Sequence, residues 1–133
     1  MPKLNIVQVT PMLQVPDFSI AFKFFTEILG FSAPFRLGNY AYLELEGAGV
    51  RILEERGRPP VELENARTTI YFDVRDVDAL YAELKPRLAA LPGGDVQGPR
   101  DQHWNQRELQ VRLPDGNWLT FGQPSRRQRL DCA

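Results

Sequence analysis

The fold of this chain is decided by one pattern that occurs twice: TPMLQVPD at residues 10–17 and TIYFDVRD at residues 69–76. Each copy is followed by apolar residues at helical spacing and then by a glycine-bearing hairpin pattern, at residues 45–50 and 113–118. A repeated strand, helix and hairpin has equivalent strand positions in both copies. The repeat therefore predicts one shared site to which two strand positions of each copy contribute.

The first copy is predicted to begin with a strand at residues 4–10, where apolar and polar residues alternate towards the end. Residues 12–15 should continue extended, because Pro16 disfavours helical backbone in the residue before it. Asp17 is a natural N-cap and Gly30 a natural stop for the helix between them. The apolar stripe of this helix consists of Phe18, Ala21, Phe22, Phe25, Ile28 and Leu29.

The second copy repeats this pattern, with Asp76 as the N-cap of its helix. Pro86 is expected to end the helix because it lacks the N–H and clashes with the preceding turn, which leaves residues 87–91 as a separate short turn. The predicted buried stripe consists of Val77, Leu80, Tyr81 and Leu84.

Hairpin strands are predicted after each helix, at residues 39–46 and 50–55 in the first copy. In the second copy they lie at residues 107–113 and 118–122, around a turn that contains proline and glycine. Residues 92–106 read as a long loop, and loops of that length in a compact domain are usually functional.

Composition points to an ordinary globular domain of 133 residues with 43% hydrophobic residues. The formal charge of −1 excludes the basic surface that nucleic-acid binding requires, and the one basic cluster, at residues 126–129, reads as a solvated tail. The single cysteine, Cys132, allows no intramolecular disulfide. No apolar run approaches the roughly 20 residues of a membrane span. We expect no leader segment and a cytoplasmic location.

Two motifs of this chain resemble a known family: VPD at residues 15–17 with the aromatic and glycine pattern at 22–31, and WNQRELQVRLPDGN at residues 104–117. They are similar to the opening and closing signatures of the glyoxalase/bleomycin resistance/dioxygenase group, the vicinal oxygen chelate superfamily, over about residues 4–123. The resemblance implies an α+β fold of two βαβββ modules that form a curved mixed sheet, a cup, with helices on the outside. We expect a single domain over residues 1–133, with modules at about 4–55 and 67–123, a linker at 56–66 and a flexible tail at 124–133.

Enzymes of this superfamily hold a divalent metal at four strand positions, which the resemblance places at Thr10, Ile52, Thr69 and Thr120. Such metals need imidazole, carboxylate or thiolate ligands, and the only histidine, His103, lies in a loop. We therefore expect no metal, no cofactor and no catalytic residue. The alternative is a metal-dependent lyase or dioxygenase with atypical ligands, such as a carboxylate of Glu44 or Glu54.

The resemblance is nearest to the metal-free bleomycin-resistance branch, which implies a non-catalytic homodimer that sequesters an aromatic or peptide-like antibiotic or metabolite. Trp104 stands where that branch stacks a tryptophan on the ligand, although packing under its own loop is the alternative. The branch also implies pocket walls at Phe35, Tyr40 and Tyr42, which strand packing explains equally, and a rim residue at Arg107, which a surface salt bridge would explain. Pro11 implies that the N-terminal strand is exchanged with the partner subunit.

Overall fold

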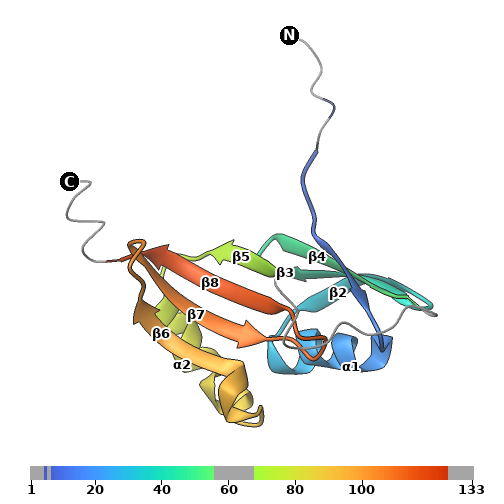
Figure 1. Cartoon of the computed structure of the whole chain (residues 1–133). Helices are drawn as coiled ribbons and strands as arrows, with labels where there is room; N and C mark the ends of the chain where they lie inside the picture. Colours follow the sequence, from blue (N-terminus) through green and yellow to red (C-terminus); the bar gives the residue numbers. More distant parts are fainter. Residues whose placement is uncertain (1–4, 6, 56–67, 126–133) are drawn as a thin grey trace. The chain divides into compact units, whose positions relative to one another are not determined.

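The computed structural model describes residues 5, 7–55 and 68–125, in two compact units that span Met1–Pro59 and Pro60–Ala133 (Figure 1). Each unit runs strand, helix, strand, strand, strand. The predicted α+β class and the pair of βαβββ modules are confirmed. The expected linker at 56–66, the basic cluster at 126–129 and Cys132 lie outside the described residues.

The first unit is a four-stranded mixed sheet with its helix on one face. Its strands lie in the order β1-β4-β3-β2, with β1 parallel to β4 and the other pairs antiparallel. The elements are β1 Met12–Val15, α1 Phe18–Lys23 with its π-helical continuation η1 Phe24–Ile28, β2 Ser32–Leu37, β3 Tyr40–Leu45 and β4 Ala48–Glu54. The sequence patterns did not predict β2.

Both ends of the first helix follow the prediction. The side chain of Asp17 accepts a hydrogen bond from the backbone N–H of Ile20 at 3.0 Å, and Gly30 adopts a φ of 83°. Between them the last turns widen, because the N–H of Leu29 bonds the carbonyl of Phe24 five residues back. A second cap comes from the far end of the unit, where Glu54 Oε1 accepts from the N–H of Phe18 at 3.1 Å.

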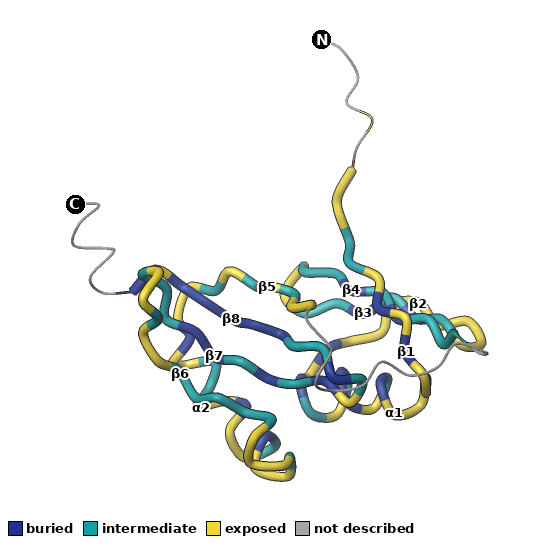
Figure 2. Tube along the Cα trace, viewed as in Figure 1, coloured by how far each residue is buried: buried dark blue, intermediate teal, exposed yellow. Residues whose placement is uncertain are grey.

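The strand predicted at residues 4–10 is wrong for the part of that segment that the structure describes. Pairing with β4 begins only at Met12, opposite Arg51, and residues 7–10 belong to no strand. This segment is largely exposed (Figure 2), with Val7 94% and Val9 90% exposed. Alternation therefore identified residues suited to a strand, but no strand in the described part of the chain pairs with them.

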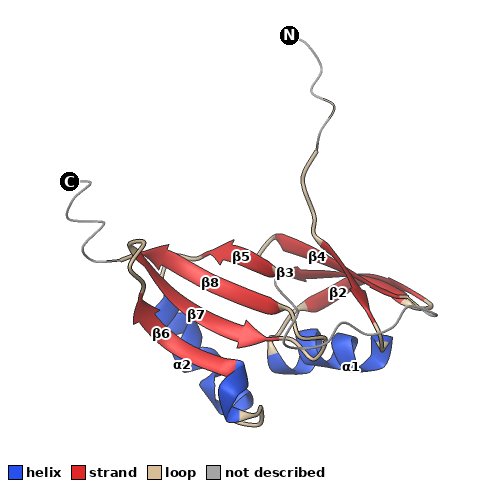
Figure 3. Ribbon diagram, viewed as in Figure 1, coloured by secondary structure: helices blue, strands red, loops and turns tan. Residues whose placement is uncertain are grey.

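The second unit repeats the first, with strand order β5-β8-β7-β6 and α2 along one face of the sheet (Figure 3). The rings of Phe72 and Phe121 stack 5.0 Å apart under this helix-covered face. The elements are β5 Thr69–Asp73, α2 Val77–Leu88, the 3₁₀ turn η3 Gly93–Asp95, β6 Val96–Asp101, β7 Gln106–Arg112 and β8 Trp118–Pro124.

Two predictions for this unit need correction. The helix does not break at Pro86 but continues to Leu88, because Leu84 and Leu88 are both buried at the four-residue spacing of one helix face. Tertiary burial thus outweighs the local cost of the proline. The long loop predicted at residues 92–106 contains η3 and β6, which leaves residues 102–105 as the connection to β7.

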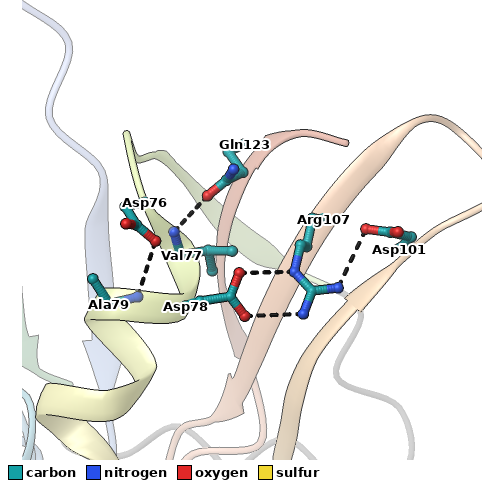
Figure 4. Close-up of polar contacts among 7 residues, drawn as sticks. All are labelled: Asp76, Val77, Asp78, Ala79, Asp101, Arg107 and Gln123. Carbon is teal, nitrogen blue, oxygen red and sulfur yellow. Dashed lines mark hydrogen bonds and ion pairs between the residues drawn. The ribbon is translucent and has the colours of Figure 1, made fainter. Parts of the chain in front are cut away.

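The N-terminus of α2 is fixed in the same way as that of α1. Asp76 caps the N–H of Ala79 at 3.0 Å, as predicted, and Gln123 Oε1 accepts from the N–H of Val77 at 2.5 Å (Figure 4). Gln123 at the end of β8 is therefore the counterpart of Glu54 at the end of β4.

Strand alternation divides each sheet into a helix-covered face and an open face, by which we mean the face opposite the helix. Leu43 and Leu109 are fully buried on the helix-covered faces, so their neighbours point the other way. Glu44 therefore shares the open face with Tyr40 and Tyr42. The helix-covered sheet faces are built from Leu13, Val15, Ala41, Leu43, Val50, Ile52, Leu109, Val111, Leu119 and Phe121.

Candidate functional site

The strand register corrects one of the four positions at which the superfamily places metal ligands. Met12 pairs with Arg51, and its equivalent Tyr71, 59 positions later, pairs with Thr120. The counterpart of Thr120 is therefore Arg51, not Ile52, whose fully buried side chain lies on the helix-covered face. The prediction slipped by one residue because the second hairpin turn is longer.

That difference in length is visible in the pairing of the two hairpins. Leu45 pairs with Ala48 across a two-residue turn, whereas the N–H of Leu113 bonds the carbonyl of Asn117 across three residues. A slip of one residue moves a side chain to the opposite face of a sheet. The four corrected positions are Thr10, Arg51, Thr69 and Thr120.

These four side chains do not form a donor set for a divalent metal. Thr69 Oγ1 and Thr120 Oγ1 lie 2.8 Å apart and bond each other, and Thr10 Oγ1 accepts from Arg51 Nε at 2.9 Å. A guanidinium is a cation with donors only, so it repels a metal ion instead of ligating it. Within the described residues, no three His, Cys, Asp or Glu side chains gather at one point.

Neither carboxylate considered as an atypical ligand changes this conclusion. Glu54 lies at the helix-covered side, where it bonds the first turn of α1. Glu44 is on the open face, but one carboxylate makes a poor metal site. The donor set therefore does not favour a metal-dependent lyase or dioxygenase.

The open face of the second unit holds a buried carboxylate. Glu108 on β7 is only 2% exposed. Trp104 Nε1 donates to its Oε2 at 3.0 Å, and Gln110 Nε2 donates to its Oε1 at 3.3 Å. The Tyr71 hydroxyl also bonds it. All three partners are neutral, so the negative charge is solvated by fixed donors instead of water.

Tyr71 reaches this carboxylate by lying across Gly122, which pairs with Glu108 on the neighbouring strand. A Cβ atom at residue 122 would lie 1.9 Å from the Tyr71 hydroxyl, so only glycine leaves room for the ring. Gln106 Oε1, 3.2 Å away, is a second acceptor for the same O–H. Burial and the hydrogen bond to Glu108 raise the pKa of Tyr71 well above its ordinary value.

Trp104 is the most exposed member of this group, ahead of Tyr71. The residue is 49% exposed, while its indole N–H donates to Glu108 and the His103 ring lies edge-on at 4.6 Å. The two predicted alternatives were packing under the loop and facing a ligand. The structure shows an indole that is fixed at one edge and leaves half of its surface uncovered.

The other predicted pocket aromatics gather on the open face of the first unit. Phe35 on β2 is 52% exposed, and its ring contacts that of Tyr40 at 6.0 Å between centroids. Tyr42 shares the strand face of Tyr40 and pairs with Arg51 across the sheet. The structure thus brings Phe35, Tyr40 and Tyr42 together, in a different unit from Trp104.

Arg107 does not join either group. Its position on β7 alternates with Glu108, and its guanidinium makes a two-pronged bond to Asp78 on α2, with both distances 2.9 Å (Figure 4). A third contact reaches Asp101 at 3.3 Å. These contacts lower the pKa of Asp78 and raise that of Arg107. The interaction ties helix to sheet, as the salt-bridge alternative proposed.

Sequence reasoning missed three residues of these open faces: Arg51, Tyr71 and Glu108. The signal for Glu108 was present, because it alternates with the apolar residues Leu109 and Val111 and so had to point away from the helix. Nothing in the sequence indicated that this opposite face would bury a carboxylate as well.

The sequence of this chain matches a known protein family. The family model described as Glyoxalase/Bleomycin resistance protein/Dioxygenase superfamily matches residues 5–121, and the chain belongs to this superfamily. A comparison with curated protein sequences finds no match. None of the described helices is long and apolar enough to cross a membrane.

Several solved structures share the fold at low identity. A bleomycin-binding protein in complex with bleomycin superimposes with a TM-score of 0.72 at 22% identity, covering 90% of this chain and 100% of that one. The bleomycin-binding protein from bleomycin-producing Streptomyces verticillus, with copper(II)-bleomycin, gives 0.71 at 21% identity, covering 90% and 97%. A glyoxalase/bleomycin resistance protein/dioxygenase from Nocardioides gives 0.69 at 20% identity, covering 93% and 87%.

Proposed function

We propose that this protein is a non-catalytic cytoplasmic binding protein that sequesters an aromatic or peptide-like antibiotic or metabolite, as drug-resistance and self-immunity proteins do. The observation that carries this proposal is Trp104, an exposed indole anchored to the buried carboxylate of Glu108. Support also comes from relatives of the same fold that were solved with bleomycin bound.

The fixed orientation of Trp104 lowers the entropy cost of binding a flat ligand. A half-exposed indole gains little stability for its own chain, yet here its orientation is fixed by a charge-assisted hydrogen bond. An aromatic side chain that is already ordered loses less entropy when a flat ligand stacks on it. The acceptor charge on the indole N–H also increases electron density in the ring, which favours stacking with electron-poor rings.

A fluorescence titration tests this role with two matched variants. The chain has two tryptophans, so Trp118→Phe leaves Trp104 as the reporter and Trp104→Ala leaves Trp118. Aromatic natural products, including bleomycin, are titrated into the wild type and both variants. A ligand stacked on Trp104 quenches the wild type and Trp118→Phe, leaves the emission of Trp104→Ala nearly unchanged, and binds that variant about tenfold or more weakly by calorimetry. Equal quenching of Trp104→Ala would exclude the stacking role.

We also propose that the protein is a homodimer in which the N-terminal segment pairs with the partner subunit. Val7 and Val9 carry apolar side chains that are almost fully exposed, which is the state expected of a strand whose neighbour is another chain. Removal of residues 1–10 should then shift the protein towards a monomer in gel filtration with light scattering. A dimer of undiminished stability would contradict strand exchange.

A further inference from the structure

Arg51 lies near the middle of the open face of the first unit, on the inner strand β4 between β1 and β3. Three side chains hold its guanidinium. Nε donates to Thr10 Oγ1 at 2.9 Å, Nη1 donates to the Tyr40 hydroxyl, and the group lies 4.9 Å from the centroid of the Tyr42 ring. The cation is therefore fixed in orientation by groups on the neighbouring strand β3 and on the segment that precedes β1.

None of these partners carries a negative charge. Within residues 5, 7–55 and 68–125, the described ion pairs of arginine belong to Arg107 and Arg112, and Arg51 makes none. Glu44 shares the open face with Arg51, but the two side chains form no described ion pair, for which a nitrogen and an oxygen must lie within 4.0 Å. Arg51 is thus a half-buried cation whose described contacts are all neutral.

The hydrogen bonds of Arg51 leave donors to spare. A guanidinium has five N–H groups, and the two described bonds use one at Nε and one at Nη1. The remaining donors match the planar two-oxygen geometry of a carboxylate. A cation that has lost part of its hydration without gaining a counter-charge is stabilised most by an anion that supplies both.

We propose that Arg51 binds the carboxylate of an aromatic acid, whose ring contacts the aromatic residues beside it. Phe35, Tyr40 and Tyr42 provide ring surface within the same unit, and two of them already contact the guanidinium. This assignment deepens the proposed binding function by naming the ligand class, and it rests on that function for the claim that the ligand is a small aromatic compound.

Arg36 provides a matched control. Its guanidinium also lies over aromatic rings, 4.4 Å from the Phe22 centroid, but it is exposed and pairs with Ala41 on the helix-covered face. Water reaches the exposed Arg36 side chain, so an anionic ligand would stabilise it less than Arg51. If anion binding were a nonspecific charge effect, replacing either arginine would weaken it. If Arg51 forms a specific site, only its replacement does so.

The experiment compares 2-naphthoate with 2-naphthamide, which differ in charge but little in shape, by calorimetry. The wild type and Arg36→Met should bind the naphthoate at least tenfold more tightly than the amide, and Arg51→Met should bind both alike. Glu44→Gln should strengthen naphthoate binding several-fold by removing a nearby negative charge. Unchanged amide affinity and circular dichroism show that Arg51→Met is folded. A wild type that binds both compounds equally, or a preference that survives in Arg51→Met, overturns the proposal.

A second measurement separates this site from the proposed function. The side-chain ¹H–¹⁵N signal of Arg51 Nε is followed during titration with sodium acetate, with sodium chloride at equal ionic strength as control. A saturable shift with acetate but not with chloride supports the anion site, even if no aromatic compound binds and Trp104 contacts no ligand. No shift with acetate overturns the site, whatever the tryptophan titrations show.

Discussion

The bond between Trp104 and Glu108 predicts a measurable coupling in stability. The change is a double-mutant cycle of Trp104→Phe, which keeps an aromatic ring but has no N–H, and Glu108→Gln, which keeps the shape but removes the charge. If the indole N–H is held by the carboxylate at 3.0 Å, the two substitutions are not additive. Trp104→Phe removes the bond and Glu108→Gln removes its charge assistance, so each replacement costs less after the other has been made.

The expected coupling follows from the exposure of the two partners. A hydrogen bond to a charged group contributes about 1.5–3 kcal/mol, against about 0.5–1.5 kcal/mol for a neutral one. Glu108 is 2% exposed, but Trp104 is 49% exposed, so its N–H returns to water when the bond is lost. We therefore expect a coupling of about 1 kcal/mol, below the range for a fully buried bond to a charged group.

Urea unfolding followed by far-ultraviolet circular dichroism gives the four free energies without using tryptophan emission. The control cycle pairs Glu108→Gln with Trp118→Phe, because Trp118 packs against Arg112 at 4.7 Å and has no described bond to Glu108. That cycle should be additive within about 0.5 kcal/mol. A Trp104 cycle that is no larger than this control would refute the claim that Glu108 fixes the indole.

Three further predictions concern the same unit. Gly122→Ala should destabilise the protein by about 1–2 kcal/mol in urea unfolding, because its Cβ displaces the Tyr71 hydroxyl, and the cost should largely vanish in a Tyr71→Ala background. Folding raises the pKa of Tyr71, so its stabilising effect is full below the ordinary tyrosine value of about 10 and is lost as pH rises. Between pH 9 and pH 11 the free energy of unfolding should therefore decline less for Tyr71→Phe than for the wild type. Arg107→Met should cost less than about 1 kcal/mol and leave ligand affinity unchanged. The lowered pKa of Asp78 means that this cost is present at neutral pH and disappears as pH falls below about 4, which acid titration of both proteins by circular dichroism would check.

The sequence was most informative where a local physical rule governs the structure. Asp17 and Asp76 were predicted as caps from their position before apolar periodic segments, and both side chains bond the first turn. The hairpin strands followed from alternation and turn residues in the same way. These features depend on a few neighbouring residues, so a single sequence contains the information.

Predictions that depend on distant parts of the chain were less successful. The placement of Ile52 failed because one extra residue in a turn shifts the register, and register is set by pairing between strands. The break at Pro86 failed because burial of Leu84 and Leu88 against the sheet outweighs the local penalty. The burial of Glu108 depends on Trp104, Gln110 and Tyr71, of which Tyr71 comes from another strand, so no local pattern could reveal it.

The caps that Glu54 and Gln123 place on the two helices have a consequence for the order of folding. Each side chain comes from the last strand of its unit and reaches the first N–H of the helix, across 36 residues in the first unit and 46 in the second. During synthesis the helix leaves the ribosome first, with this N–H still open to water. The contact closes only when the final strand has been made and paired, so we expect each unit to acquire its full stability in one cooperative step at its last strand and not progressively along the chain.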